Sequence, residues 1–556
     1  MKLTPDQKLA GVLVPVFALR GSGDLGIGDT VAVKEMIDWC ARHGFRLLQM
    51  LPINETGPDH SPYNAISALA LDPTTIATTP ETLSGLSEDR FRRIVGGVDT
   101  AGPVNYRKVK MLKQDLLRAA FQYGGERKEV AAFARANPWV ENYTLYRALL
   151  DENNGNDNWE SWPKEQQSPA TVPSALLRKL EERRRFYAYV QWVAHEQWVD
   201  VRRHAEERGV ALMGDIPFGV SRTSADVWAN RELFDLTWSG GAPPEATFQP
   251  DAFTAQWGQN WGIPLYRWEA HRKEKFAWWK RRVQQTSAIF HLFRIDHVLG
   301  FYRIYAFPWL PRDNGQFTGL TAEEAKQKTG GKLPRFFPHP DDTPAHKQAN
   351  CKQGESLLKM IQKAAGQAVV VAEDLGCVPE YVRPNLLKLG IPGFKIPYWE
   401  RNPDYTYADG VTYPRLSIVT PATHDHDPLV VRWQQMWRAH DEARARQDHH
   451  NAYLTWLELQ RFAGWAGHNT ENIPRDFTPE LHKAFCRRVL ESNAWLAVFM
   501  ITDIFAQPIR FNVPGSFAES NWSARLEKKV IDWDNDPALF EKTRMFERLL
   551  TETRRC

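Results

Sequence analysis

The sequence predicts an α/β protein, a (β/α)8 TIM barrel with mainly helical subdomains inserted in its loops. Two patterns carry this prediction: eight short apolar runs, and helical periodicity between most of them. In addition, no Pro- or Ser-rich linker separates a second domain. We therefore treat residues 1–556 as a single barrel domain.

The eight apolar runs are predicted strands, with interiors rich in Val, Ile, Leu and Phe, as in a sheet covered on both faces. They are residues 11–19, 46–53, 210–218, 289–295, 368–375, 393–399, 416–420 and 498–505. Helical patterns at 30–43, 273–286 and 355–365 fall between strands. This alternation favours the barrel.

Three insertions interrupt the alternation. Residues 84–207 follow the second strand and predict a helical insertion, with helices at 109–123, 129–137 and 173–208. Two further segments are predicted to be long loops on the active-site side of the barrel: residues 221–266, which are rich in Trp, Gly and Pro, and residues 311–345.

Composition excludes several classes of protein. The 556 residues carry a net charge of only +3, which gives no electrostatic case for binding nucleic acid or an anionic membrane. No apolar run is long enough to span a bilayer, and the N-terminus lacks a secretory apolar region. The five scattered cysteines predict free thiols in a reducing cytoplasm. The 22 tryptophans favour core packing ahead of sugar binding.

Gly21, Gly23 and Gly26 match the dinucleotide pattern G-x-G-x-x-G after the first predicted strand. In a true fingerprint the helix begins within the motif, so that its N-terminus faces the pyrophosphate. Here the predicted helix begins beyond the third glycine. We therefore expect a tight backbone approach beside a site, and no nucleotide cofactor.

Four acidic residues fall at the carboxyl ends of four different predicted strands: Asp215, Asp296, Glu373 and Asp425. Active sites of this fold assemble at that end of the barrel, whereas a structural carboxylate has no reason to favour it. Asp296 by itself, in the segment 290–300, is as compatible with a structural ion pair as with catalysis. The four placements together favour a carboxylate-based active site.

Carboxylates that converge near Trp and Tyr suit glycoside chemistry. One attacks the anomeric carbon and a second protonates the leaving oxygen, at a separation of about 5–5.5 Å in retaining enzymes. Arg294, on the same strand face as Asp296, can keep a nucleophile ionised, and the apolar residues before Glu373 suit an acid that must keep its proton. Tyr63, in a Ser-Pro-Tyr loop, is equally suited to stacking on a ligand and to holding the loop.

Several motifs, spread over roughly residues 11–525, carry a family resemblance. They are Arg-Ile-Asp-His with Asp296, Ala-Glu-Asp-Leu-Gly with Glu373, Thr-His-Asp-His-Asp with Asp425, and the segments 61–63, 214–217, 224–228, 258–262, 510–515 and 521–522. In order and number they resemble the amylomaltases, or 4-alpha-glucanotransferases (disproportionating enzymes), of the alpha-amylase clan. The resemblance implies a retaining enzyme that transfers alpha-1,4-glucan segments from a donor maltooligosaccharide to the 4-OH of an acceptor glucan or glucose.

The resemblance also implies roles for particular residues. Asp296 would be the nucleophile, Glu373 the general acid/base, and Asp425 the carboxylate that holds hydroxyls of the donor sugar. The implied substrate contacts are Arg294, Asp215, His297 and His424 in the donor subsite, and Tyr63 and Trp261 against the sugars. The implied partners are maltooligosaccharides and alpha-1,4-glucans, with no cofactor, metal, nucleic acid or membrane. The sequence has no signal for an oligomeric state.

Residues 294–304 resemble the plant cytosolic branch of this family more than the usual bacterial form, although we expect no starch-binding domain before the first strand. Residues 216–222 depart from the common version of their loop.

Three alternatives remain open at this point. His424-Asp-His-Asp427 has the residue types of a metal site, which would suit a metal-dependent hydrolase, although the first and fifth strands offer no histidine partner. A non-catalytic glycan-binding protein would have no need of a nucleophile together with an acid. Hydrolysis competes with transfer, because both use the same glycosyl-enzyme intermediate and differ in whether water or a sugar hydroxyl resolves it.

Overall fold

The computed structural model describes residues 3–125, 127–246, 249–516 and 520–556. Its centre is a sheet of eight parallel strands in the order β10-β11-β12-β1-β2-β3-β6-β9. The backbone N–H of Ala372 donates to the carbonyl of Pro392 (2.9 Å), which joins the two ends of this order. The predicted (β/α)8 barrel is confirmed. The strands are β1 Leu9–Leu13, β2 Leu47–Gln49, β3 Ala211–Ile216, β6 Leu292–Ile295, β9 Val369–Ala372, β10 Gly393–Lys395, β11 Ser417–Val419 and β12 Leu496–Met500.

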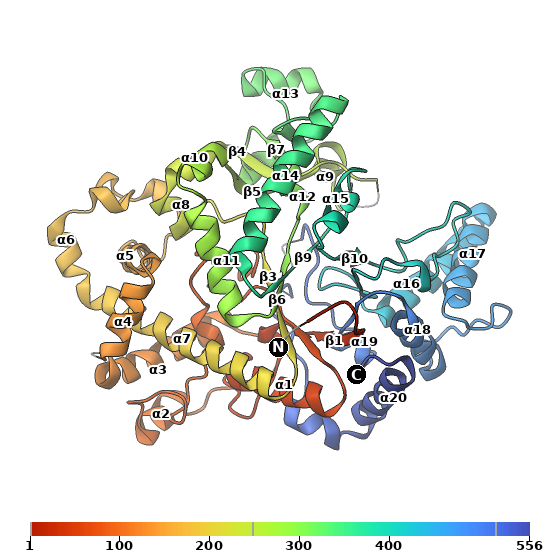
Figure 1. The fold of residues 1–556 in the computed structure, drawn as a ribbon, viewed down its shortest axis with the longest axis horizontal. Helices are drawn as coiled ribbons and strands as arrows, with labels where there is room; N and C mark the ends of the chain where they lie inside the picture. The colour runs from red at the N-terminus through yellow and green to blue at the C-terminus, as the bar shows by residue number, and fades with distance from the viewer. Residues whose placement is uncertain (1–2, 126, 247–248, 517–519) are drawn as a thin grey trace.

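Helices cover the outside of the barrel (Figure 1), which is why the strands are apolar on both faces. These helices are α1 Thr30–Arg42, α7 Glu181–Glu207, α11 Ala277–Ile289, α14 Pro344–Ala365, α15 Val382–Lys388, α18 Pro479–Glu491 and α20 Pro537–Thr553. The chain ends meet at the base of the barrel, where the N–H of Ala10 donates to the carbonyl of Arg555 (3.1 Å).

The predicted strands differ from the observed ones in their limits. In three of them the apolar run includes helical residues, because an apolar run does not distinguish a strand from a buried helical turn. The run 11–19 holds only the end of β1, and Pro15, which lacks an N–H, precedes the 3-10 helix Val16–Ala18. The run 289–295 begins with the last residue of α11. The prediction for 498–505 is wrong in its second half, where helix α19, Ile501–Ile504, follows β12.

Between β2 and β3 the chain forms a mainly helical lobe at one side of the barrel (Figure 1). Its helices are α2 Glu88–Val95, α3 Tyr106–Gly124, α4 Lys128–Ala136, α5 Trp139–Glu152, α6 Ser174–Lys179 and the start of α7. The predicted helix 173–208 is two helices, α6 and α7, which meet at Leu180. Helix α7 returns the chain to the barrel.

The segments 221–266 and 311–345 contain regular structure, which corrects the prediction of long loops. Strands β4 Phe234–Ala242 and β5 Gln259–Tyr266 join β7 Ile304–Phe307 and β8 Arg335–Phe337 in an antiparallel sheet of order β5-β4-β7-β8. The register of β4 against β5 shifts around Gly240 and Gly241, and such irregularities break the two-residue alternation by which a strand is read from sequence. Short helices complete this region: α8 Ala225–Ala229, α9 Ala252–Trp257, α10 Trp268–Lys273, α12 Leu299–Tyr302 and α13 Ala322–Thr329.

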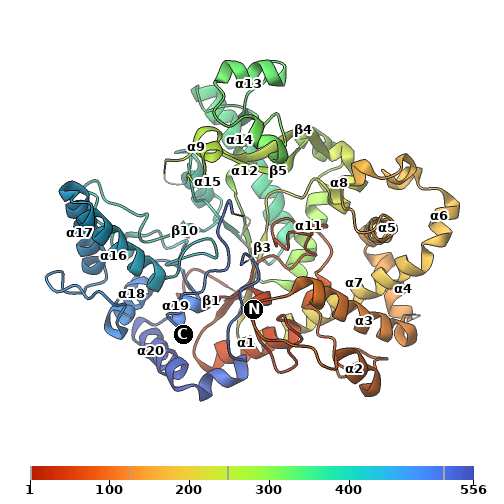
Figure 2. The same cartoon turned by 180° about the vertical axis from the view of Figure 1, so that it is seen from behind.

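A third lobe is the helix pair α16 Leu429–Ala445 and α17 His449–Trp465, which projects on the side opposite the α2–α6 lobe in both views (Figures 1 and 2). Most tryptophans lie in the core, as the sequence favours, whereas Trp261 and Trp399 are 38% and 47% exposed. No helix among the described residues is long and apolar enough to cross a membrane.

Candidate active site

The four predicted acidic residues lie at the carboxyl ends of their strands. Asp215 is the next-to-last residue of β3, and Asp296, Glu373 and Asp425 follow β6, β9 and β11. Backbone bonds extend the barrel ladder to two of them: the N–H of Asp296 donates to Ile216 O (2.9 Å) and the N–H of Glu373 to Ile295 O (3.0 Å). Two of the side chains therefore start from fixed backbone positions at one barrel face.

Arg294 connects two of these carboxylates. One guanidinium nitrogen donates to Asp215 Oδ2 (2.7 Å) and the other to Asp296 Oδ1 (2.7 Å). The Arg294 side chain is only 5% exposed. Burial would lower the pKa of Arg294, but the two carboxylates raise it well above its usual value. Arg294 thus holds both carboxylates at once through short, charge-assisted bonds.

Asp215 is fully buried and also accepts a hydrogen bond from the Tyr63 hydroxyl (2.8 Å). Burial raises the pKa of Asp215 to about 7, and the Asp296 charge adds to this effect while Arg294 opposes it. Asp215 therefore binds the same guanidinium as Asp296, but its own carboxyl group is shielded from solvent.

Glu373 has different surroundings. Its Oε2 accepts the backbone N–H of His297 (2.8 Å), the residue immediately after Asp296. Burial raises the pKa of Glu373 to about 8, with the neighbouring Asp296 charge adding to the rise and Arg294 opposing it. Glu373 is therefore mostly protonated at neutral pH, as a general acid must be.

Asp425 is held by residues on both sides of it. His424 Nε2 lies 3.3 Å from Asp425 Oδ2, and the Asn512 amide donates to Oδ1 (2.6 Å). Burial would raise the pKa of Asp425, but His424 and Asn512 outweigh it and lower the pKa. Arg510 donates to the Asp425 carbonyl (2.6 Å), so the backbone is fixed as well. Asp425 is thus an ionised acceptor at the barrel mouth.

Aromatic rings lie beside these groups. Tyr63 stacks on His424, with ring centres 5.1 Å apart and planes at 9°. Trp522 lies against both, at 5.8 and 6.0 Å. Trp261, in β5 and 38% exposed, meets the His297 ring edge-on at 4.7 Å. Burial lowers the pKa of His297 to about 4, so this imidazole is neutral at pH 7.

The nine residues that the sequence singles out thus lie in two runs of contacts, which meet at the adjacent residues Asp296 and His297. One runs from Trp261 through His297 to Glu373, and the other from Asp296 through Arg294, Asp215 and Tyr63 to His424 and Asp425. Sequence reasoning missed Asn512, Arg510 and Trp522 as contacts of this site. They lie after β12 in irregular chain, where neither periodicity nor a strand end marks them, although they belong to the motifs at 510–515 and 521–522.

The structure also gives the contacts of two other sequence motifs, the glycine loop and the histidine-rich motif. Asp29 accepts the N–H groups of Val31 and Ala32, so the helix that follows the glycine loop is capped by its own chain. His426, in the histidine-rich motif, has its Nδ1 2.7 Å from Thr423 Oγ1. Within the described ranges no cluster of three or more His, Cys, Asp or Glu has a metal-binding arrangement.

The chain matches a family model and curated proteins over most of its length. The model, described as 4-alpha-glucanotransferase of glycoside hydrolase family 77, matches residues 14–530. The 4-alpha-glucanotransferase of Chlamydia caviae is 29% identical over 533 residues, covering 94% of this chain and 91% of that protein. That of Thermus thermophilus is 29% identical over 539 residues, covering 93% and 94%. The rice 4-alpha-glucanotransferase DPE2 is 31% identical over 316 residues, which cover 54% of this chain and 32% of that protein.

Two solved structures share the fold. An amylomaltase from Streptococcus agalactiae, in complex with acarbose, has a TM-score of 0.77 at 20% identity and covers 99% of this chain and 100% of its own. An amylomaltase from Corynebacterium glutamicum has a TM-score of 0.76 at 20% identity, with coverage of 98% and 76%. Because the family model spans residues 14–530, the chain belongs to the 4-alpha-glucanotransferases of glycoside hydrolase family 77, retaining enzymes of the alpha-amylase clan.

Proposed function

We propose that Asp296 and Glu373 carry out the two displacements of a retaining glucan transfer. Asp296 attacks the anomeric carbon of the donor, and a bond forms from its carboxylate oxygen to that carbon as the glycosidic bond breaks. Glu373 gives its proton to the departing glycosidic oxygen, which leaves as the 4-OH of the released sugar. In the second step Glu373 takes the proton from the acceptor 4-OH, whose oxygen replaces Asp296 on the anomeric carbon.

The contrast between these two side chains supports the proposal most strongly. Asp296 accepts a 2.7 Å charge-assisted bond from Arg294, whereas burial raises the pKa of Glu373 to about 8 and so favours its protonated form. A carboxylate held by a guanidinium, on the strand next to a buried carboxyl that keeps its proton, is the arrangement that acid-assisted nucleophilic attack requires.

The remaining residues hold the donor sugar. Asp425, ionised and fixed by Asn512, accepts hydrogen bonds from sugar hydroxyls, and the neutral His297 and His424 donate to others. The exposed face of Trp261 packs against a sugar ring. The substrates are alpha-1,4-glucans and maltooligosaccharides. The five free cysteines support a place in the reducing cytoplasm.

Transfer and hydrolysis are separated by incubating the purified protein with maltotriose. Transfer of a maltosyl unit between two maltotriose molecules yields glucose and maltopentaose, and repetition yields a ladder of longer glucans. Hydrolysis yields only glucose and maltose. We expect the ladder, resolved by chromatography. Products limited to glucose and maltose would refute transfer, and an Asp296→Asn sample run in parallel reports any contaminating activity.

A further inference from the structure

One face of helix α3, in the α2–α6 lobe, contacts the loops around the active site. Tyr106, Lys110 and Lys113 are spaced at i, i+4 and i+7, so they lie along a single stripe of the helix. Each contacts a different piece of chain: the segment after α19, the loop that carries Tyr63, and the residues near Thr74. We call this stripe the α3 brace.

Tyr106 makes the contact nearest the site. Its hydroxyl donates to the carbonyl of Trp522 (2.6 Å), and its ring stacks on His60, with centres 4.1 Å apart and planes at 12°. His60 and Trp522 both have left-handed backbones, with φ of 59° and 61°. Non-glycine residues adopt this conformation rarely and against a steric cost, so surrounding contacts must hold it. Tyr106 contacts both.

These two residues lie next to rings of the candidate site. Trp522 packs against Tyr63 and His424, and His60 is three residues before Tyr63 in the same loop. Tyr63 in turn donates to Asp215, and His424 lies against Asp425. A shift of the Trp522 backbone therefore moves its ring against Tyr63 and His424, the rings that contact Asp215 and Asp425.

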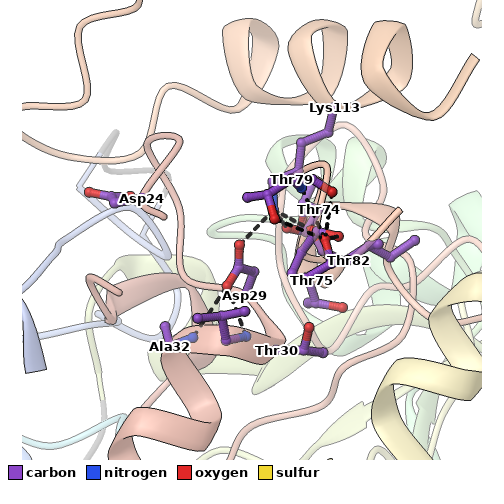
Figure 3. Close-up of polar contacts among 12 residues, drawn as sticks. Asp24, Asp29, Thr30, Ala32, Thr74, Thr75, Thr79, Thr82 and Lys113 are labelled. Carbon is purple, nitrogen blue, oxygen red and sulfur yellow. Dashed lines mark hydrogen bonds and ion pairs between the residues drawn. The ribbon is translucent and has the colours of Figure 1, made fainter. Parts of the chain in front are cut away.

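At the other end of the brace, Lys113 connects α3 to residues beside the first barrel helix. Figure 3 shows its side chain reaching from its helix into a group of threonines beside Asp29. The ammonium donates to the carbonyls of Thr74 (2.7 Å) and Ile76 (2.6 Å) and lies 3.6 Å from Asp29 Oδ2. Asp29 is itself the N-cap of α1, so the brace is tied to the first barrel helix.

Lys110 lies between these ends of the brace. Its ammonium donates to the carbonyls of Thr56 (3.2 Å) and Gly57 (3.4 Å), at the start of the loop that carries Tyr63. The segment before the helix is tied down too, because the N–H of Val104 donates to Ser523 O (2.8 Å). The loop that carries Tyr63 and the segment that carries Trp522 are thus both held by α3 and the residues just before it.

We propose that Tyr106 is a positioning residue for glucan transfer, acting through the Trp522 backbone, and that the helical lobe serves the reaction through the α3 brace. This inference rests on the proposed function, because it takes the rings of Tyr63 and Trp522, which pack against His424, as part of the donor subsite. Tyr106 itself lies behind Trp522 and is buried, at 7% exposed.

The test is a double-mutant cycle of Tyr106→Phe and Trp522→Ala. Tyr106→Phe keeps the ring on His60 and removes the single bond to Trp522, so we expect kcat/KM for maltotriose to fall about fivefold, the net effect of one hydrogen bond. In the Trp522→Ala background, where the ring that transmits the shift is gone, Tyr106→Phe has no further effect. A purely structural role would give equal losses in both backgrounds and would overturn the proposal.

Tyr146→Phe is the matched control. Tyr146 is fully buried in the same lobe, and its hydroxyl also donates to a backbone carbonyl, that of Thr223 (2.5 Å). We expect this variant to match Tyr106→Phe in thermal stability while keeping the wild-type kcat/KM. An equal loss of activity in both variants would attribute the effect to general loosening of the lobe and contradict the proposal.

A binding measurement separates this inference from the proposed function. Calorimetric titration of maltohexaose into Glu373→Gln protein, with and without Tyr106→Phe, reports donor binding without turnover. We expect Tyr106→Phe to weaken binding about fivefold. Unchanged binding and unchanged kcat/KM in a wild-type background that transfers glucan would refute the brace alone. A wild-type protein that yields no maltotriose ladder would refute the proposed function instead.

Discussion

Glu373 and Asp374 are neighbours at the end of β9, yet they have opposite surroundings. Glu373 accepts one backbone N–H, from His297, and lies near the Asp296 charge. Asp374, only 3% exposed, accepts the N–H of Phe394 (2.7 Å) and a guanidinium N–H of Arg383 (3.1 Å). The first carboxyl keeps hydrogen-bonding capacity for a substrate, whereas the second is committed to the protein.

Asp374 adds a side-chain bond at the junction that closes the barrel, where the backbone bond from Ala372 to Pro392 is the other link. Strands β9 and β10 are the two ends of the sheet order, and Phe394 lies in β10. A Cβ on Gly393 would come within 2.7 Å of Asp374 Oδ1, so glycine is needed beside this carboxylate. The comparison teaches that a carboxyl at a strand end serves either chemistry or closure, and that its partners decide which.

The largest expected effect separates the two roles by activity. Asp296→Asn and Glu373→Gln should each lower the rate by at least about a thousandfold, or roughly 4 kcal/mol of barrier, because each removes a group that makes or breaks bonds. Glucose release from maltotriose measures this loss. Asp374→Asn, the control at the neighbouring position, should keep most of the activity. Near-full activity in either of the first two variants would contradict the assigned roles.

The pH dependence provides the next largest effect. Glu373 must be protonated to release the leaving group, so kcat/KM for maltotriose should fall above about pH 8, approaching tenfold per pH unit. With alpha-maltosyl fluoride as donor, the leaving fluoride needs no proton and this alkaline decrease should disappear. The same decrease with both donors would assign it to a group other than Glu373. No such dependence is expected of Asp374, whose contacts lie away from the substrate.

The smallest effect concerns stability, where we expect a change at Asp374 to matter more than a change at Glu373. Asp374→Ala leaves the buried N–H of Phe394 without its acceptor, which should lower the free energy of unfolding by about 1–3 kcal/mol. Asp374→Asn keeps an acceptor oxygen and should cost less. Glu373→Gln should leave stability close to wild type. Urea denaturation at pH 7 compares the three, and a Glu373→Gln protein less stable than Asp374→Ala would reverse our assignment of closure.

The fold and the four acidic candidate residues could be predicted from local patterns in the sequence. Apolar runs of strand length, and the acidic residues at the ends of four of them, are both local signals in the sequence. Parallel strands bring their carboxyl ends to one face. Strand limits were less accurate, as at 498–505, because burial on all sides makes a strand and a short helix equally apolar. The antiparallel sheet of β4, β5, β7 and β8 escaped prediction, because its irregular register hides the alternation.

By itself, then, the sequence determined the barrel, the insertion that carries α3, and the candidates Asp215, Asp296, Glu373 and Asp425. Only the tertiary structure decided that Glu373 accepts the N–H of the residue after Asp296 while Asp374 accepts that of Phe394, and that Tyr106 lies behind Trp522. The physical reason is that a protonation state and a hydrogen-bond partner depend on burial and on groups far away in the chain. No local pattern encodes which distant residue arrives beside a strand end.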